Sequence, residues 1–182
     1  VFSIFIEANP RIVHKKDFYP QADIVFNLAL TDAGHAPVSI AKLYIGNGGE
    51  LAEGNSLFKQ KHKTEVKDYV ATFGISTNDF FKQLELYLSE KFENYSVMLR
   101  LNCEGVEDEV IYAAYQSFEK KLEMICGSLK DVEDIKGTEA AKKLDLFLLD
   151  NELPFTRFTS GIDSWPEAHK SVLSFLNKEP LI

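Results

Sequence analysis

The sequence contains little cysteine and little histidine, which limits the metal and thiol chemistry it can support. It has two cysteines, Cys103 and Cys126, and four histidines in separate segments, with no CxxC pair and no histidine at ligand spacing from either cysteine. Zinc sites use closely spaced ligands of this kind. We therefore expect no metal and no cofactor. Free thiols in a reducing compartment, the cytoplasm, are favoured over a disulfide, which two cysteines alone do not exclude.

Long apolar runs and a surplus of basic residues are also missing. No stretch approaches the roughly twenty apolar residues of a membrane-spanning helix, so no membrane span is expected. Lys and Arg number 20 against 28 Asp and Glu, which gives a formal net charge of −8. Because nucleic-acid binders gather Lys and Arg on one surface, nucleic acid is not an expected partner. A negative chain instead associates faster with a basic protein.

Recognisable catalytic motifs are absent as well. There is no GxSxG elbow and no HExxH helix, so we assign no catalytic residue and expect that the chain is not an enzyme. The acidic residues Glu104, Glu107, Asp108 and Glu109 lack the ligand spacing of a calcium loop, and we interpret them as a solvated hairpin turn. The basic group at Lys59, Lys61, His62 and Lys63 is interpreted as part of a solvated loop.

The 182 residues are sufficient for one core, and the hydrophobic content of 45% is typical of a globular chain. The chain begins with Val1 rather than Met, as expected of a processed or trimmed piece, in which a signal peptide would not be visible.

Alternation of apolar and polar residues predicts six strands. These are VFSIFIEA from residue 1, ADIVFNLALT from 22, VSIAKLYIGN from 38, YVATFGIS from 69, YSVMLRLNC from 95 and VIYAAYQSF from 110. The last two are predicted to form an antiparallel hairpin. Helical spacing begins near Ser76 to Asn78, which are candidate N-caps, and returns from Phe118 to the end of the chain.

Strands joined by turns rather than by crossover helices predict an α+β fold. We expect a mainly antiparallel β-sandwich at 1–117, with an inserted helix near Phe80, and a C-terminal helical appendage at 118–182 packed on it. The series IVFNLALTDAGHAPVSIAKLYI, DYVATFGIS and YSVMLRLNCEGVEDEVIYAAY resembles the immunoglobulin-like sandwich domains of uncharacterised bacterial proteins. The resemblance implies a scaffold and transfers no functional residue, since the strand tryptophan and the intersheet cysteine pair of that fold are missing.

The loop TDAGHAP, from Thr31 to Pro37, is predicted to reverse the chain between two strands rather than to bind a ligand. Gly34 is expected to adopt positive φ. Gly34→Val should therefore cost about 1 kcal/mol or more of stability, whereas His35→Ala should be nearly neutral for stability and binding.

The segment LDNELPFTRFTSGIDSWPEAH has the most unusual composition, because it combines charges with the single tryptophan. Such a loop can form a recognition surface, since Trp and Arg contribute strongly to binding when desolvated. The candidate binding residues are Asp150, Glu152, Arg157, Asp163 and Trp165. The alternative is structural, with the aromatic residues buried between helices and sheet and Arg157 paired with a nearby acid.

These observations favour a non-catalytic protein-interaction or accessory module whose partner is another protein. A small acidic inhibitor or immunity-type protein that binds a basic enzyme is the alternative, because its negative face would attract such a partner. A hydrolase that uses carboxylates such as Asp150 and Asp163 is a further alternative.

Overall fold

The computed structural model describes residues 1–13, 22–32, 36–46, 49, 55–61, 68–157 and 165–177. Within the last range, the side chains of 165–169 and 171 are not described. Gly34 and His35 of the predicted reversal, together with His62 and Lys63, lie outside the described residues.

Among the described residues, two of the three sheets are entirely parallel. Strand β1 (Ile4–Glu7) pairs with β2 (Ile24–Asn27), and β7 (Leu122–Gly127) lies between β6 (Val97–Leu101) and β8 (Phe155–Arg157). Parallel neighbours need a long connection, and here the connections from β6 to β7 and from β7 to β8 contain helices. The architecture is therefore α/β.

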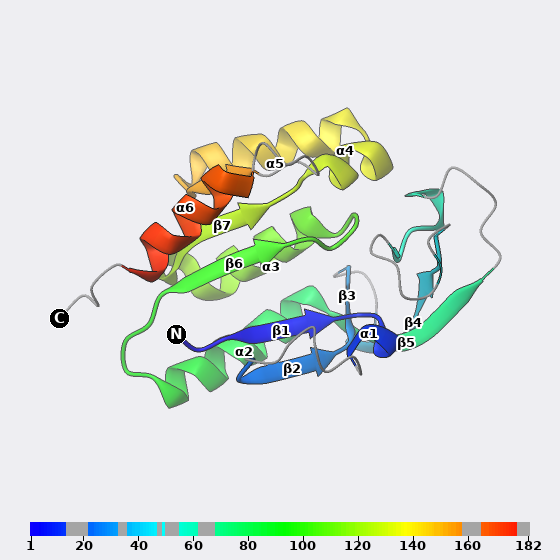
Figure 1. Ribbon diagram of the computed structural model, residues 1–182, viewed down its shortest axis with the longest axis horizontal. Helices are drawn as coiled ribbons and strands as arrows, with labels where there is room; N and C mark the ends of the chain where they lie inside the picture. The colour runs from blue at the N-terminus through cyan, green and yellow to red at the C-terminus, as the bar shows by residue number, and fades with distance from the viewer. Residues whose placement is uncertain are drawn as a thin grey trace.

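The third sheet is mixed, with the order β3-β5-β4. Strand β5 (Tyr69–Ser76) is parallel to β3 (Ala29–Thr31) and antiparallel to β4 (Val38–Tyr44). Strands β4 and β5 extend away from the parallel strands, at the right of the view in Figure 1. We call these two strands the β4–β5 arm.

Helices lie on both sides of the parallel strands (Figure 1). They are α1 (Pro10–Val13), α2 (Thr77–Lys91), α3 (Glu107–Phe118), α4 (Lys130–Lys136), α5 (Thr138–Asp150) and α6 (Trp165–Leu176), with single 3-10 turns at Lys59–Lys61 and Glu119–Lys121. Helices α2 and α3 lie behind the strands in Figure 1, and α6 lies in front of β6 and β7. None of the described helices is long and apolar enough to cross a bilayer.

The main core lies between the parallel strands and helices α2, α3 and α5. Its fully buried side chains include Phe81, Leu101, Ile111, Ile125 and Leu144, which come from five different elements. Burying each one contributes about 1.5–3 kcal/mol relative to exposure. The core thus joins segments from both halves of the sequence.

The predicted α+β fold and the resemblance to immunoglobulin-like β-sandwich domains are wrong, because the sheets are parallel or mixed. Alternation along a strand reports that one face is buried, but it does not report the direction of the neighbouring strand. The predicted division at 117/118 stays a prediction. The pairing of β6 with β7 joins residues on either side of it.

The predicted hairpin after residue 95 is wrong for a second reason, since its second strand is helix α3. Val110, Ala113 and Ala114 are buried at helical spacing, and the acids from Glu107 to Glu109 occupy the first turn, where the helix dipole favours negative charge. The helix predicted from Phe118 is interrupted by β7, whose consecutive buried residues are typical of a parallel strand covered on both faces.

Several local predictions are confirmed. The sequence at 1–8 contains β1, the sequence at 22–31 contains β2 and β3, and the two segments that follow are β4 and β5. Helix α2 has Ser76 at its N-cap position, as the sequence indicates, although the Ser76 side chain makes no capping hydrogen bond.

Candidate functional site

A long cleft separates β1 from β6, and we call it the β1–β6 cleft. Its volume is about 2100 Å³, and residues 1–9 and 94–104 line it along the whole length of both strands. Phe81 and Leu88 of α2 and Val110 of α3 form part of its lining, and Phe175 of α6 also contributes. Both strands line this cleft, and they run in the same direction (Figure 1).

Apolar side chains of both strands form part of the cleft wall, beside polar residues such as Arg100. Ile4 and Ile6 of β1 pack against the main core, as do Val97 and Leu99 of β6. Phe5 points to the opposite face of β1, lines the cleft and is 39% exposed. The middle of the cleft therefore presents hydrophobic side chains to a ligand.

The cleft lies between two separate parallel sheets, β1-β2 and β6-β7-β8. From β1 the chain continues to β2 on one side, and from β6 it continues to β7 on the other. In open parallel sheets, ligands bind beside the carboxyl ends of the strands. Glu7 ends β1 and is followed by Ala8 and Asn9, and β6 is followed by Asn102 to Gly105; all of these except Gly105 line the cleft.

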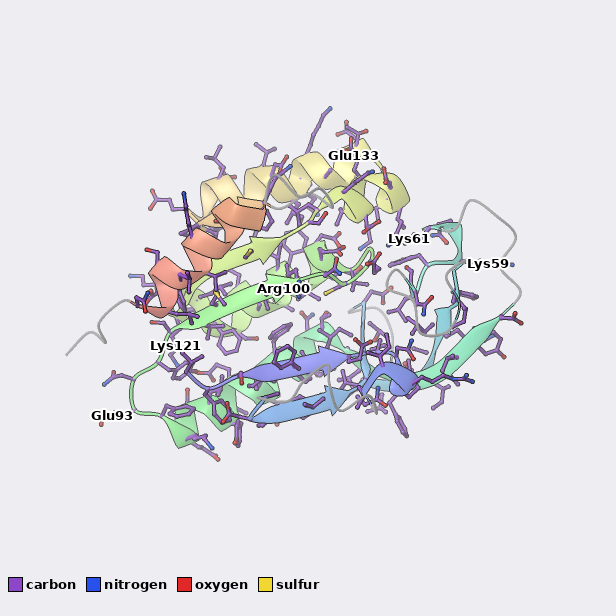
Figure 2. The ribbon with its side chains drawn as sticks, viewed as in Figure 1. Lys59, Lys61, Glu93, Arg100, Lys121 and Glu133 are labelled. Atoms are coloured by element: carbon purple, nitrogen blue, oxygen red, sulfur yellow. The ribbon has the colours of Figure 1, made fainter. Side chains whose placement is uncertain are left out.

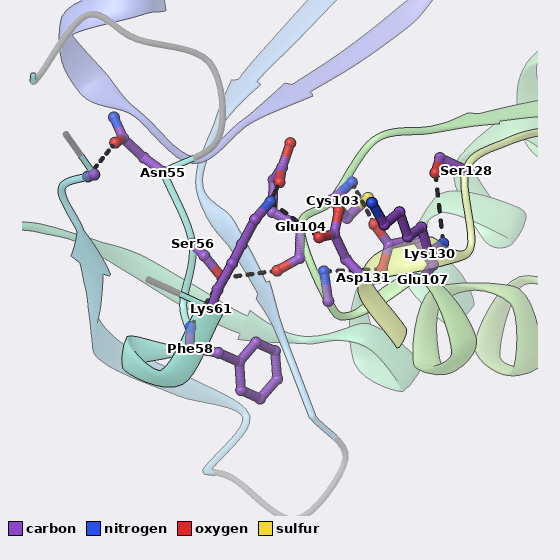
Figure 3. Close-up of polar contacts among 12 residues, drawn as sticks. Asn55, Ser56, Phe58, Lys61, Cys103, Glu104, Glu107, Ser128, Lys130 and Asp131 are labelled. Carbon is purple, nitrogen blue, oxygen red and sulfur yellow. Dashed lines mark hydrogen bonds and ion pairs between the residues drawn. The ribbon is translucent and has the colours of Figure 1, made fainter. Parts of the chain in front are cut away.

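The loop after β6 is held by the carboxylate of Glu107, which is 1% exposed. Its Oε1 accepts the backbone N–H of Cys103 at 2.9 Å, and its Oε2 accepts that of Gly105 at 2.9 Å (Figure 3). Glu104 and Gly105 both adopt positive φ, at 59° and 119°. Burial raises the pKa of Glu107, although the two N–H groups oppose this shift. The acidic group after β6 is thus partly buried and structural, so its interpretation as a solvated turn is wrong.

Polar contacts of Lys61 and Ser56 join the segment 55–61 to this loop. Lys61 Nζ forms ion pairs with Glu104 and with Asp131 of α4, the latter at 3.3 Å (Figure 3). Ser56 Oγ donates a hydrogen bond to the Glu104 carbonyl at 2.7 Å. Lys61 is half-buried, so its interpretation as part of a solvated loop is wrong.

The amino end of the cleft carries another charged group. Lys121 Nζ donates to Glu85 Oε1 at 2.9 Å and to Tyr95 Oη at 3.0 Å. Figure 2 shows Lys121 near the amino end of β6 and Arg100 on the strand itself. The carboxyl end carries the acids Glu7, Glu104, Asp131 and Asp134 beside the cations Lys61 and Lys130. The two ends therefore differ in charge.

The two thiols are poorly suited to nucleophilic chemistry. Burial, with a smaller contribution from the Glu107 charge, raises the pKa of Cys103 to about 12, and burial also raises the pKa of Cys126. Because the thiolate is the reactive form, both side chains stay unreactive near neutral pH. Both cysteines are free. Within the described ranges, no group of three His, Cys, Asp or Glu side chains could hold a metal ion.

The predicted binding residues that the structure describes lie away from this cleft. Asp150 ends α5, Glu152 follows with a φ of 51°, and Arg157 of β8 forms an ion pair with Asp145 of α5. None of these residues lines the β1–β6 cleft, although Glu152 borders a separate hollow of about 390 Å³. The pairing of Arg157 with a nearby acid agrees with the structural alternative. Asp163 lies outside the described residues, as does the side chain of Trp165, so this surface stays a prediction.

Sequence reasoning missed the residues at the carboxyl ends of β1 and β6. Glu7, Asn9 and Glu104 each follow an apolar alternating run, which would have marked them as candidates if the strands had been recognised as parallel. No protein-family model matches this chain, and comparison with curated proteins and with solved structures likewise gave no match.

Proposed function

We propose that this chain is a non-catalytic binding module whose β1–β6 cleft takes an extended segment of another protein. The observation that supports this function is the size and shape of the cleft. Small-molecule sites have volumes of about 300–1,000 Å³. The cleft is about 2100 Å³ and follows the full length of two strands. An extended peptide matches this shape better than a compact metabolite does.

The lining residues indicate the chemistry of the partner segment. Apolar side chains in its middle would meet Phe5 and Met98, since extended peptides commonly place alternate side chains in such grooves. A basic residue at one end would meet the acids at the carboxyl end of the cleft. The net charge of −8 would raise the rate of association with a basic partner.

A second candidate function is inhibition of a basic enzyme. The acids at the carboxyl end of the cleft support this candidate as well, because they would attract a basic surface. Both functions require salt-sensitive capture of a basic protein. They differ in the consequence, because an inhibitor suppresses the partner's activity and an accessory module does not.

A pair of neighbouring side chains allows a direct test. Phe5 and Val25 are partners in the β1–β2 register and are 39% and 38% exposed, but only Phe5 lines the cleft. The wild-type protein would be used to select binders from a phage-displayed library of random peptides, and affinities would be measured by fluorescence anisotropy. Phe5→Ala should weaken the selected peptides about tenfold, a loss of roughly 1.4 kcal/mol. Val25→Ala should change their affinity little. Equal effects of the two variants, or a library from which nothing is enriched, would contradict the proposal.

A second pair tests the charge of the partner. Asp134 lines the carboxyl end of the cleft, and the adjacent Glu133 does not, although both are exposed (Figure 2 labels Glu133). Selection against Asp134→Asn should yield fewer peptides with Lys or Arg, whereas selection against Glu133→Gln should match the wild type. Unchanged Lys and Arg content with Asp134→Asn would rule out the basic end of the segment.

A further inference from the structure

The β4–β5 arm exposes one apolar face. Val38, Ile40, Phe73 and Tyr69 are 63%, 67%, 62% and 50% exposed. Ile40 pairs with Phe73 in the register, Val38 pairs with Ile75, and Tyr69 pairs with Tyr44, so these side chains are neighbours on one side of the ribbon. Leu43 and Thr72, which point to the other side, are buried.

This face is unusual for a surface. A single exposed apolar residue is ordinary, but a contiguous group that includes two aromatic rings is typical of an interaction site. Aromatic side chains have areas of about 150–250 Å², so the exposed parts of Tyr69 and Phe73 together offer on the order of 200 Å². Val38 and Ile40 bring the face to roughly 400 Å² by the same reasoning.

The arm also differs from the rest of the chain in charge. The chain has 28 Asp and Glu residues, yet β4 and β5 contain none. Their one ionic side chain, Lys42, lies with Nζ 4.8 Å from the centre of the Tyr69 ring, where the ring face stabilises the cation. Strands β4 and β5 themselves therefore present no carboxylate to another acidic molecule, although the exposed Asp68 precedes β5.

From these observations we infer that the arm is a self-association surface, on which two copies of this chain pack the faces of their β4–β5 arms together across a two-fold axis. A two-fold contact uses the same patch on both copies, and this apolar patch has no carboxylate and a single cation, Lys42, which is stacked on Tyr69. Two faces supply about 800 Å², which is below the roughly 1,000 Å² of a stable specific interface, so the dimer is a weak, transient one.

Salt separates this association from the capture of a basic partner. Two copies with a net charge of −8 repel each other, and salt screens this repulsion, so the dimer should become more stable as ionic strength rises. Binding of a basic protein should weaken over the same range. The proposal does not depend on the β1–β6 cleft, and Phe5→Ala should leave the dimer unchanged.

Sedimentation velocity over a range of protein and salt concentrations tests the proposal. The wild type should form dimers, and Ile40→Glu should raise the dissociation constant of the dimer at least tenfold. The matched control is Leu149→Glu, which places the same charge on an exposed leucine of α5 and should have no effect. Circular dichroism would verify that both variants fold. Mixing Ile40→Glu with Ile40→Lys should restore association above that of either variant alone. A monomeric wild type at all concentrations, open-ended assembly, equal effects of the two glutamate variants, or loss of a different protein partner on Ile40→Glu would each overturn the inference.

Discussion

Glu107, in the first turn of α3, accepts the backbone N–H of Cys103 at 2.9 Å and so fixes the loop that leaves β6. Its second oxygen holds Gly105 in the same way. Glu107→Gln should cost about 1–3 kcal/mol of unfolding free energy, because the amide offers one oxygen and leaves the other N–H facing an NH₂ group. Urea titration of both proteins would measure this loss. An unchanged free energy of unfolding would show that the carboxylate does not hold the loop.

The pKa of Glu107 adds a pH dependence to this contribution. Burial raises the pKa of the folded carboxyl above its ordinary value of about 4.5, so the folded chain holds the proton more tightly than the unfolded chain. Between pH 4.5 and the raised pKa, the folded chain therefore binds more protons than the unfolded chain. The free energy of unfolding falls as pH rises across this window. The difference in unfolding free energy between wild type and Glu107→Gln should decrease as pH rises from acidic to neutral. A difference that grew with pH would mean that the pKa is lowered instead.

Gly105 is required at its position both by its backbone and by its neighbours. Its φ is 119°, and a Cβ there would lie 2.6 Å from Ile135 Cδ1 and 2.9 Å from Phe58 Cδ2. Gly137 provides a matched control, since it has a φ of 90° and a Cβ added to it would meet no atom within 4 Å. Both Ala variants should lose stability through the backbone, and Gly105→Ala should lose about 1–3 kcal/mol more through overpacking. Thermal or urea denaturation would measure both, and equal losses would show that the neighbours of Gly105 yield without cost.

The sequence predicted local structure better than it predicted how the strands assemble. The alternation around Ile4 and around Phe73 correctly indicated strands, because a half-buried strand requires it. The directions of β1 and β6 depend on distant partners, and alternation carries no information about them. Helix α3 was missed because the apolar residues near Val110 fit both a strand and a helix over a short window.

The site was missed for the same reason, since it depends on two strand ends that are far apart in the sequence. Glu7 and Glu104 approach the same cleft only because β1 and β6 run in the same direction. The composition of the segment around Arg157 drew attention instead to a surface where Arg157 is paired with Asp145. The segment with the most unusual composition thus contains a residue of a structural ion pair between α5 and β8. The segments that line the cleft have no unusual composition that would have identified them.

Substitution of Lys61 would show whether the ligand places a basic or an acidic group at the carboxyl end of the cleft. In the free protein the charge of Lys61 compensates Glu104 and Asp131. Lys61→Met removes this charge and leaves both carboxylates available to a cation. A peptide with a basic end should then bind about two- to fivefold more tightly, since a partly exposed charge contributes at most about 1 kcal/mol. The effect should shrink as salt is added.

The control for this prediction is Lys59→Met, which removes the same charge from an exposed position two residues away (Figure 2). Lys59 does not line the cleft, so its loss should change the affinity much less than the loss of Lys61. Fluorescence anisotropy with a peptide selected against the wild type would compare the three proteins. Weaker binding by Lys61→Met would instead mean that Lys61 contacts a negative group on the ligand, such as a peptide carboxylate, and the proposed orientation of the segment would then be wrong.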